Sequence, residues 1–227
     1  MLYYINMHVE RLHKWSVNVH QALGIQRNLA TKVLQAKGFI DPHLIVGLDV
    51  AISNKREAVA AAVVLNYPDL KVVEIAIVKG KVDFPYIPGL LSFREVPLTL
   101  RACEQLRSTP DLVMVDGQGL AHPRRMGLAS HLGLFLNLPT IGCAKSHLYG
   151  ELQEPELEFG ATGNIFGDAG EIIGAVVRTR AGVKPLFVSV GHKIDLSTCV
   201  HWVLECCRGY RLPEPTRLAH LASQEKF

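Results

Sequence analysis

The sequence predicts a mixed α/β fold in which helices pack on one central sheet. Three observations support this prediction. Short apolar stretches typical of strands come first, at residues 45–50, 58–65 and 71–78, with short connections between them. Strand-like and helix-like patterns then alternate along the rest of the chain. Residues 112–115 are all apolar, which is typical of a strand covered on both faces. Grouped strands followed by alternation favour a mixed sheet.

Length and composition limit the classes of protein that fit. The 227 residues suffice for a substantial core, and no repeat or linker divides them, so we expect a single domain over residues 1–227. Apolar residues make up 48% and charged residues 20%, an ordinary globular balance. The net charge of +3 is too small to indicate a nucleic-acid partner by itself, and the charges are too mixed for a disordered chain.

The chain shows no sign of a membrane or secretory protein. Its N-terminal residues mix charged with apolar side chains, unlike a signal peptide, and no apolar stretch reaches 18 residues. The odd number of cysteines and the lack of a C-x-x-C pair or zinc-ligand spacing favour reduced thiols. We therefore expect a cytoplasmic monomer that binds no membrane. The five cysteines are Cys103, Cys143, Cys199, Cys206 and Cys207.

The first third of the chain predicts a helix followed by an antiparallel meander. Apolar residues recur at helical spacing through residues 8–38, and Gly38 suits a helix end. The three strands that follow are joined by a polar loop at 53–57 and a turn at 67–69. Connections this short join antiparallel neighbours.

A stiff segment comes next. Pro85 and Pro88 flank two residues in this segment. Because proline has no backbone N–H to donate to a neighbouring strand, the segment cannot be part of a central strand. We expect a helix from Ser92 to Leu106, with Ser92 as N-cap and Glu95 as its capping-box partner.

The remaining elements alternate between strand and helix. We expect, in order, a strand at 112–115, a helix at 127–136, a strand at 140–145, a polar surface excursion at 151–160, and strands at 172–178 and 186–190. Asp195 then caps a helix that Gly209 can end. After a rigid connector containing two prolines, Thr216 caps a final helix that carries His220.

Two isolated carboxylates stand in the apolar strands. Asp49 interrupts the first strand, and Asp116 follows the run at 112–115. Open α/β sheets place ligands at the carboxyl ends of their strands. If the two strands are neighbours, the carboxylates repel each other unless a metal holds them, and oxygen ligands suit Mg²⁺. Glu95 and His220 could complete such a site from helices.

Each of these residues also has a structural interpretation. Asp116 could cap the next helix or form a turn with Gly117, Glu95 could be a capping or surface residue, and His220 could be a surface histidine. The cations of these regions could simply be solvated: Lys145, Arg124 and Arg125. Spacing alone names no substrate.

Longer motifs narrow these alternatives. They are VDFPYIPGLLSFRE at 82–95, VDGQG at 115–119 with HPRR at 122–125, GLASH at 127–131, TIGCAKS at 140–146 and YRLPEPTR at 210–217. In this order they closely resemble the signature motifs of the endonuclease V family, the deoxyinosine 3′ endonucleases. Because several long motifs match over roughly residues 45–220, the chain is identified as a member of that family.

The resemblance implies an RNase H-like fold, with three antiparallel strands followed by parallel strands. It also implies an enzyme that acts on DNA containing deoxyinosine, a deaminated adenine. The enzyme would depend on Mg²⁺, and Mn²⁺ could replace Mg²⁺. Such enzymes hydrolyse the second phosphodiester bond 3′ to the lesion and leave 3′-hydroxyl and 5′-phosphate ends. Two alternatives stay open: a ribonuclease for inosine in RNA, and a non-catalytic RNase H-like module that binds nucleic acid.

The resemblance also assigns roles residue by residue. The metal-site acids would be Asp49, Glu95 and Asp116, and the catalytic set would add His220 and Lys145, the latter near the scissile phosphate. The wedge that parts the strands would be Pro85, Tyr86, Ile87 and Pro88. The remaining substrate contacts, most of them around the hypoxanthine pocket, would be Gly89, Leu91, Gly117, His122, Gly142, Leu148 and Arg124.

Two positions depart from the family pattern. Val190 stands where a proline is common, which we expect to alter that loop modestly. The position of His220 is acidic in some members, so its role as direct ligand, water-mediated ligand or orienting group stays open, as does the number of metal ions.

Overall fold

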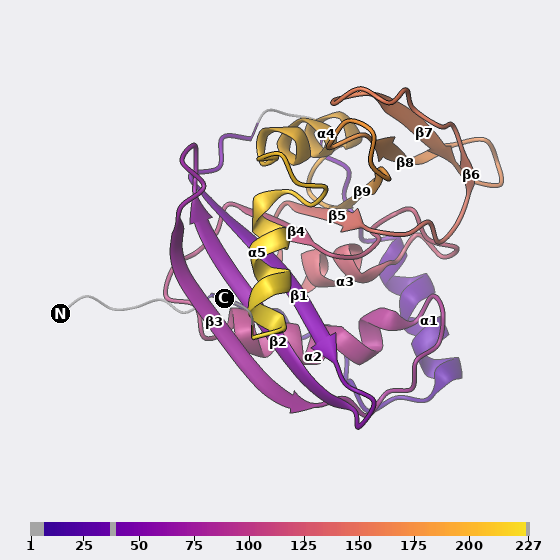
Figure 1. The fold of residues 1–227 in the computed structure, drawn as a ribbon. Helices are drawn as coiled ribbons and strands as arrows, with labels where there is room; N and C mark the ends of the chain where they lie inside the picture. Colours follow the sequence, from indigo (N-terminus) through magenta and orange to yellow (C-terminus); the bar gives the residue numbers. More distant parts are fainter. Residues whose placement is uncertain (1–6, 37–39, 226–227) are drawn as a thin grey trace.

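A nine-stranded sheet runs through the computed structural model, which describes residues 7–36 and 40–225. The strand order is β3-β2-β1-β4-β5-β9-β8-β7-β6. Helices α2 and α3 cover one face and α4 and α5 the other, while α1 packs outside the α2/α3 layer (Figure 1). No helix among the described residues is long and apolar enough to cross a membrane.

The helices and strands are α1 (Val19–Ala30), β1 (Leu44–Ile52), β2 (Glu57–Asn66), β3 (Val72–Lys81), α2 (Leu91–Cys103), β4 (Leu112–Val115), α3 (Leu128–Leu136), β5 (Thr140–Ala144), β6 (Glu151–Leu152), β7 (Thr162–Phe166), β8 (Ile172–Val177), β9 (Leu186–His192), α4 (Leu196–Glu205) and α5 (Glu214–Ser223).

The predicted mixed sheet is confirmed. β1, β2 and β3 form an antiparallel meander, and β4 and β5 join it in parallel on the other side of β1, as an RNase H-like fold requires. Beyond β5 the sheet continues through four strands that run antiparallel to their neighbours. Connections of nine, five and eight residues join β6 to β7, β7 to β8 and β8 to β9, and these are too short for the crossover that parallel strands need. The sequence analysis missed β7, and it also missed β6, which lies in the expected surface excursion at 151–160.

The first helix is shorter than predicted. It spans only Val19–Ala30 instead of residues 8–38, and Gly38 lies outside the described residues. Asn18 starts the helix with a capping box: its Oδ1 accepts from the Gln21 N–H at 2.9 Å, and Gln21 Oε1 accepts from the Asn18 N–H at 2.9 Å. Upstream, Trp15 stacks on Phe135 instead of continuing the helix. The apolar periodicity before Asn18 therefore reflects packing of an irregular segment.

The predicted cap of α2 is wrong. The helix begins at Leu91 and ends at Cys103, and no side chain caps its start. The hydroxyl of Ser92 lies inside the first turn, 3.0 Å from His131 Nδ1. A partner on a distant helix has therefore replaced the local capping bond. Glu95 is consequently free to serve elsewhere.

The final two helices are predicted with mixed success. Asp195 does cap α4, accepting from the Thr198 N–H at 2.8 Å. However, α4 ends at Glu205, before Gly209, so that glycine does not terminate it. Thr216 is not the cap of α5: it lies inside the helix, and its hydroxyl donates to the Pro213 carbonyl at 3.1 Å. Pro213 with its fixed φ starts this helix instead.

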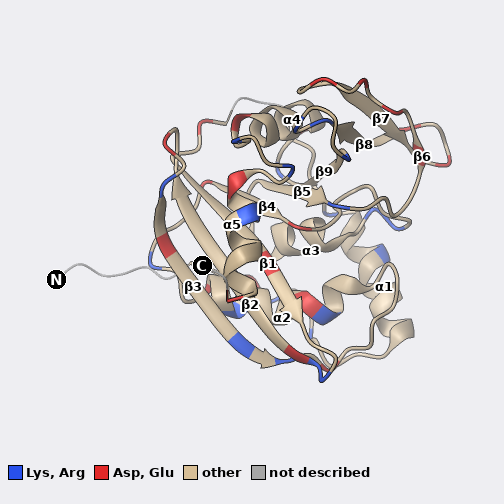
Figure 2. Ribbon diagram, viewed as in Figure 1, with Lys and Arg blue, Asp and Glu red and all other residues tan. Residues whose placement is uncertain are grey.

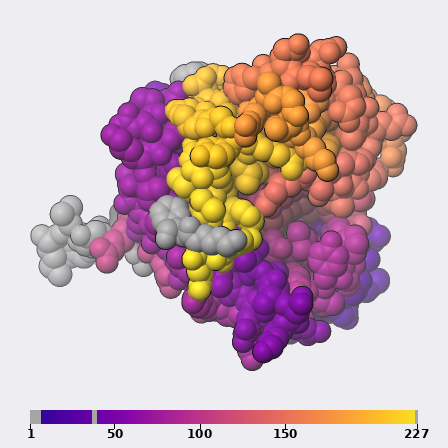
Figure 3. Space-filling view, in the orientation of Figure 1, coloured from indigo at the N-terminus to yellow at the C-terminus, as the bar shows by residue number. Residues whose placement is uncertain are grey.

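α5 lies directly on β1, and Gly47 makes this contact possible. A Cβ at Gly47 would stand 1.8 Å from the Pro215 carbonyl oxygen, which is backbone and cannot move aside as a side chain could. The yellow atoms of the C-terminal segment, which contains α5, lie on the front of the molecule in Figure 3. Gly47 therefore sets the distance between β1 and the helix that carries His220.

Gly47→Ala is accordingly expected to lower the free energy of unfolding by at least about 2 kcal/mol, since the added methyl forces two backbones apart. Urea or thermal unfolding measures this loss. Gly24→Ala is the matched control, because no atom lies within 4 Å of the new Cβ and the helical position favours alanine by up to about 1 kcal/mol. A Gly47→Ala protein as stable as the parent would contradict the close packing of α5 on β1.

Candidate active site

Two carboxylates meet where β1 and β4 run side by side. Leu48 pairs with Val115 in the parallel register, so Asp49 and Asp116 follow at adjacent positions of the sheet. α5 adds His220, whose Nδ1 lies 3.3 Å from Asp49 Oδ2. Atoms of Asp49, Asp116 and His220 that could bind a metal all lie within 4.8 Å of one another. The strands β1 and β4 are thus neighbours, as the sequence analysis supposed, and α5 places His220 beside their two carboxylates.

A serine that the sequence analysis missed also contacts this cluster. Ser223 lies one helical turn after His220 on α5, and its hydroxyl donates to Asp49 Oδ2 at 2.5 Å. His220 and Ser223 thus approach the same oxygen from one face of one helix. The i, i+3 spacing was visible in the sequence, but only the position of α5 over β1 gives it meaning.

Glu95 reaches the cluster from α2, on the other side of the sheet. It is not among the three residues whose ligand atoms group within 4.8 Å. Burial, together with the nearby charges of Asp49 and Asp116, raises the pKa of Glu95 to about 8 against the opposing effect of Arg94. Figure 2 shows acidic positions on β1 and α2 near the middle of the molecule. The charges of both carboxylates therefore affect the pKa of Glu95.

Lys145 supplies positive charge from the end of β5. Its Nζ lies 2.5 Å from Asp116 Oδ2, and its side chain is 35% exposed. Burial raises the pKa of Asp116, while the charge and hydrogen bond of Lys145 act in the opposite direction. Three carboxylates thus gather here with a histidine beside them, and Lys145 pairs with Asp116. A divalent cation would remove this excess of negative charge, so the donor set fits one.

A cavity of about 320 Å³ opens beside the acidic cluster. Asp116 and Lys145 line it, so the cluster forms part of its wall. The volume falls in the range of about 300–1,000 Å³ typical of small-molecule sites. The predicted substrate residues that line it are Tyr86, Ile87, Pro88, Gly89, Leu91, Gly117, His122 and Leu148. Segments from four parts of the chain therefore converge on one hollow.

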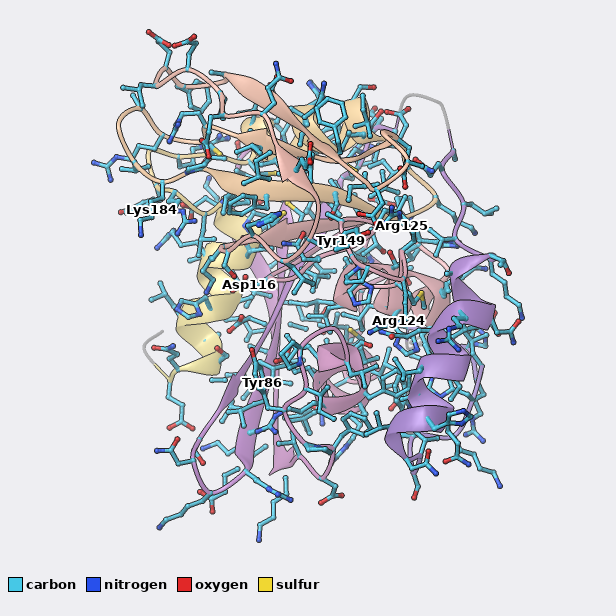
Figure 4. All side chains as sticks on the ribbon, turned by 90° about the vertical axis from the view of Figure 1, so that its right-hand side faces the viewer. Tyr86, Asp116, Arg124, Arg125, Tyr149 and Lys184 are labelled. Carbon is cyan, nitrogen blue, oxygen red and sulfur yellow. The ribbon has the colours of Figure 1, made fainter. Side chains whose placement is uncertain are left out.

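Three predicted substrate residues lie outside this cavity. Pro85 lines a separate groove of about 340 Å³ on another side of the wedge segment. Gly142 stands behind the cavity wall, where a Cβ would come within 2.6 Å of the Gly117 carbonyl oxygen. Arg124 lies toward α1 (Figure 4) and hydrogen-bonds Gln26 and the Gly89 carbonyl. Gly142 is thus connected to the cavity indirectly, by its close approach to Gly117. Arg124 is connected indirectly too, by its hydrogen bond to Gly89.

The other cations have distinct surroundings. Arg125 pairs with Glu171, and its guanidinium carbon lies 5.3 Å from the centre of the Tyr149 ring. Figure 4 labels Arg125 and Tyr149. Arg211, which the sequence analysis did not select, donates from Nη2 to the carbonyls of Lys145 at 2.5 Å and Pro185 at 2.8 Å. Arg211 therefore fixes the backbone from which Lys145 projects. Its position in the last motif was the only sequence signal.

Comparison with known proteins gives a consistent result. A sequence model of the family Endonuclease V matches residues 27–221. The chain is 51% identical to Endonuclease V of Dehalococcoides mccartyi, over 97% of this chain and 99% of that protein. The crystal structure of Endonuclease V from Streptomyces avermitilis superposes with a TM-score of 0.88 at 39% identity, covering 97% of both chains.

A second structural neighbour contains nucleic acid. It is Ciona intestinalis Endonuclease V in complex with a 24mer DNA containing an inosine followed by a ribo-adenosine. Its TM-score is 0.79 at 29% identity, and the match covers 92% of this chain and 97% of that one.

Proposed function

The chain belongs to the endonuclease V family, and we propose that it is a Mg²⁺-dependent repair endonuclease for deoxyinosine in DNA. The observation that carries the proposal is the shared wall: Asp116 and Lys145 line both the acidic cluster and the cavity. A nucleotide whose base is held in the cavity would bring the phosphodiester backbone of its strand close to the carboxylates. We further propose cleavage at the second phosphodiester bond 3′ to the lesion, with 3′-hydroxyl and 5′-phosphate products.

Asp49 and Asp116 would hold the cation, with Glu95 and His220 contributing from the two flanking helices. When bound, it would supply Lewis-acid stabilisation of the negative charge that develops on the phosphate. Oxygen ligands favour Mg²⁺, and Mn²⁺ would substitute. His220 and Ser223 orient Asp49 through their contacts with Oδ2. These contacts hold the carboxylate in place, as partners of metal ligands commonly do.

Lys145 would act on the substrate as a point charge. In the free protein it pairs with Asp116, but its partial exposure leaves it able to reach a phosphate oxygen. Arg211 steadies its backbone. Binding of a cation to Asp116 would compete with the ion pair and leave Lys145 available to the phosphate. Electrostatic preorganisation of this kind stabilises a phosphoryl transition state.

Lesion recognition would use the cavity and the wedge together. Extruding a base costs a few kcal/mol, and less for a poorly paired base such as inosine. Tyr86 is 69% exposed and is flanked by Pro85 and by Ile87 and Pro88, so it can stack on the pair left behind while its backbone stays stiff. The backbone of Gly117 and Leu91 in the cavity wall could read the O6 and N1–H edge that separates hypoxanthine from adenine.

Tyr86→Ala is expected to reduce inosine-dependent cleavage by about 10- to 100-fold through weaker lesion binding, because stacking on a base is worth about 1–3 kcal/mol. The Mg²⁺ dependence should be unchanged, since Tyr86 is not among the acidic residues. Gel-shift binding and cleavage assays measure the two effects. Phe159→Ala is the control, as it removes another exposed aromatic, 56% exposed, outside the cavity. Unchanged discrimination against adenine-containing DNA would refute the wedge assignment.

Cleavage of matched oligonucleotides tests the function itself. Three substrates carry one inosine in DNA, in RNA, or in DNA with a ribonucleotide on its 3′ side, the last because the Ciona protein was bound to such a strand. Each is incubated with Mg²⁺ and with EDTA. Preferential cutting of the DNA substrate supports the repair enzyme, and strict dependence on a ribose 2′-hydroxyl supports the inosine ribonuclease. Binding without cutting would indicate a non-catalytic module, and cutting without inosine would refute both enzymes.

Three further parts of the proposal concern the whole chain. We propose that residues 1–227 work as one domain, supported by the single sheet that joins all described strands. We also propose a monomer in the cytoplasm. The compartment is supported by four buried thiols whose pKa burial raises, as suits reduced cysteines: Cys103, Cys143, Cys199 and Cys206. Size-exclusion chromatography with light scattering tests the oligomeric state.

A further inference from the structure

A hydrogen-bond network holds one end of the wedge segment from behind. We name it the Gly89 latch, and it consists of Gln26, Gly89, His122, Arg124 and Met126. The Gly89 carbonyl oxygen accepts three hydrogen bonds, from Gln26 Nε2 at 2.9 Å, His122 Nε2 at 2.9 Å and Arg124 Nη2 at 2.8 Å. A carbonyl has two lone pairs, so three donors are an unusually complete restraint on one peptide group.

Gln26 is the central side chain of the latch. It projects from α1 and is 1% exposed. Its amide group donates to the carbonyls of Gly89 and of Met126, the latter at 3.0 Å, and its Oε1 accepts from Arg124 Nε at 2.6 Å. Both amide hydrogens and the acceptor are thus used, which fixes the orientation of the amide. Gln26 therefore ties α1 to two separate walls of the cavity.

His122 contributes in one tautomer. Its Nδ1 accepts from the Arg124 N–H at 3.1 Å, so Nε2 carries the proton that it donates to Gly89. Burial lowers the pKa of His122 to about 4, which keeps the ring neutral as this arrangement requires. His122 thus acts on the wedge through the Gly89 carbonyl.

The backbone at Gly89 makes the latch specific to this position. Pro88 and Gly89 form a tight turn closed by the Leu90 N–H and the Ile87 carbonyl at 2.9 Å, with a Gly89 φ of +78°. A Cβ here would meet Arg124 Nη2 at 2.8 Å. At the other end of the wedge, Arg94 Nη1 donates to the Phe84 carbonyl at 3.2 Å. The exposed Tyr86 therefore stands on a short segment that is held at both ends.

We infer that Gln26 and Arg124 are positioning residues, which set the wedge for lesion recognition by holding Gly89. Helix α1 then takes part in base discrimination without contributing a group to the acidic cluster. The inference rests on the proposed function, since it gives Tyr86 a nucleic-acid partner. It assigns Arg124 a role in the protein interior that differs from the direct substrate contact expected from the sequence.

A double-mutant cycle tests whether the latch acts through Tyr86. Gln26→Leu keeps the approximate side-chain volume but removes every hydrogen bond, and we expect cleavage of inosine DNA at low substrate concentration to fall by about 10- to 100-fold, chiefly through KM. In a Tyr86→Ala background the same change should cost no more than about twofold. Losses that multiply in the double variant would overturn the inference, because they would show that Gln26 acts independently of the wedge.

The matched control lies on the same helix. Gln21→Leu removes the hydrogen bond from the Asn18 N–H but touches no part of the latch. It should leave KM and the discrimination between inosine and adenine within about twofold of the parent values. Equal losses in Gln21→Leu and Gln26→Leu would overturn the inference, since they would trace the effect to the stability of α1.

Hydrogen–deuterium exchange of the free protein provides a readout that needs no cleavage. The Leu90 amide, which donates to the Ile87 carbonyl in the turn at Gly89, should exchange at least about tenfold faster in Gln26→Leu than in the parent or in Gln21→Leu. If Gln26→Leu does not fold, Arg124→Lys serves instead, because a lysine cannot donate to Gln26 and Gly89 together in the planar geometry of a guanidinium. Unchanged exchange in the folded variant would overturn the latch. If exchange is faster in Gln26→Leu but the parent protein does not distinguish inosine from adenine, the proposed function is refuted, whereas the hydrogen-bond role of the Gly89 latch is supported.

Discussion

Replacing Asp116 with alanine is expected to reduce inosine-dependent cleavage by at least about 1,000-fold, the largest loss expected of any single residue in the site. Among the described residues, Asp116 is the one carboxylate that belongs to the ligand group, contacts Lys145 and lines the cavity. Its removal takes a ligand from the cation and leaves Lys145 without its partner. Lesion binding should remain within about tenfold of the parent, because the wedge and the base-facing backbone are untouched. Single-turnover cleavage and equilibrium binding separate these effects.

The same variant should not unfold. Burial and the charge of Asp49 both disfavour the ionised form of Asp116, so its loss relieves repulsion in the metal-free protein. Lys145 is exposed enough to be solvated without it. The unfolding midpoint should therefore stay level or rise. Asp69→Ala is the matched control, as Asp69 forms only a surface pair with Lys71 and should affect neither activity nor stability. Cleavage by Asp116→Ala above about a tenth of the parent rate would remove Asp116 from the catalytic set.

The pairing of Asp49 and Asp116 could be predicted because it follows from strand order alone. Each carboxylate stands at the end of an apolar run or within one, and two parallel neighbours bring such positions to one edge of the sheet. No side-chain conformation had to be guessed. A single sequence can therefore predict functional residues whose place follows from their position on a strand and from the order of the strands.

Gln26 and Ser223 could not be found in this way. Gln26 meets Gly89 across 63 residues, and Ser223 meets Asp49 across 174. Nothing near either residue in the sequence distinguishes it from a polar residue on a solvated helix face. Their meaning comes from the packing of α1 and α5 on segments far along the chain, which depends on close contacts such as the one at Gly47.

The misplaced caps have a related cause. A serine followed three residues later by a glutamate describes a capping box, but the same spacing also occurs inside a first helical turn. At Ser92, a hydrogen bond with the buried His131 has displaced the local one, and Glu95 faces the carboxylates instead. A local rule failed here because a functional residue used the same spacing. Such conflicts between local pattern and tertiary structure are expected at functional sites.

Removal of divalent cations with EDTA is expected to abolish cleavage, and restoring Mg²⁺ should recover it with a strong dependence on pH. In the metal-free protein, the pKa of Glu95 is raised to about 8 by burial and by Asp49 and Asp116. Cation binding favours the ionised carboxylate, so each cation bound below that pH displaces a proton. The affinity for the cation should rise by up to about tenfold per pH unit and become level above about 8. Calorimetric titration in buffers of different ionisation enthalpy measures both the affinity and the proton release.

The stability of the metal-free protein should change in the opposite sense. The unfolded chain loses the Glu95 proton near pH 4.5, whereas the folded protein keeps it up to about pH 8. Between these values the folded state binds more protons, so its stability falls as the pH rises, by up to about 1.4 kcal/mol per pH unit, and becomes level above the window. Glu95→Gln cannot ionise and should flatten both the stability profile and the pH dependence of cation binding. Unaltered profiles in Glu95→Gln would show that Glu95 does not share the charge of the cluster, and the fit of the site to a divalent cation would then rest on Asp49, Asp116 and His220 alone.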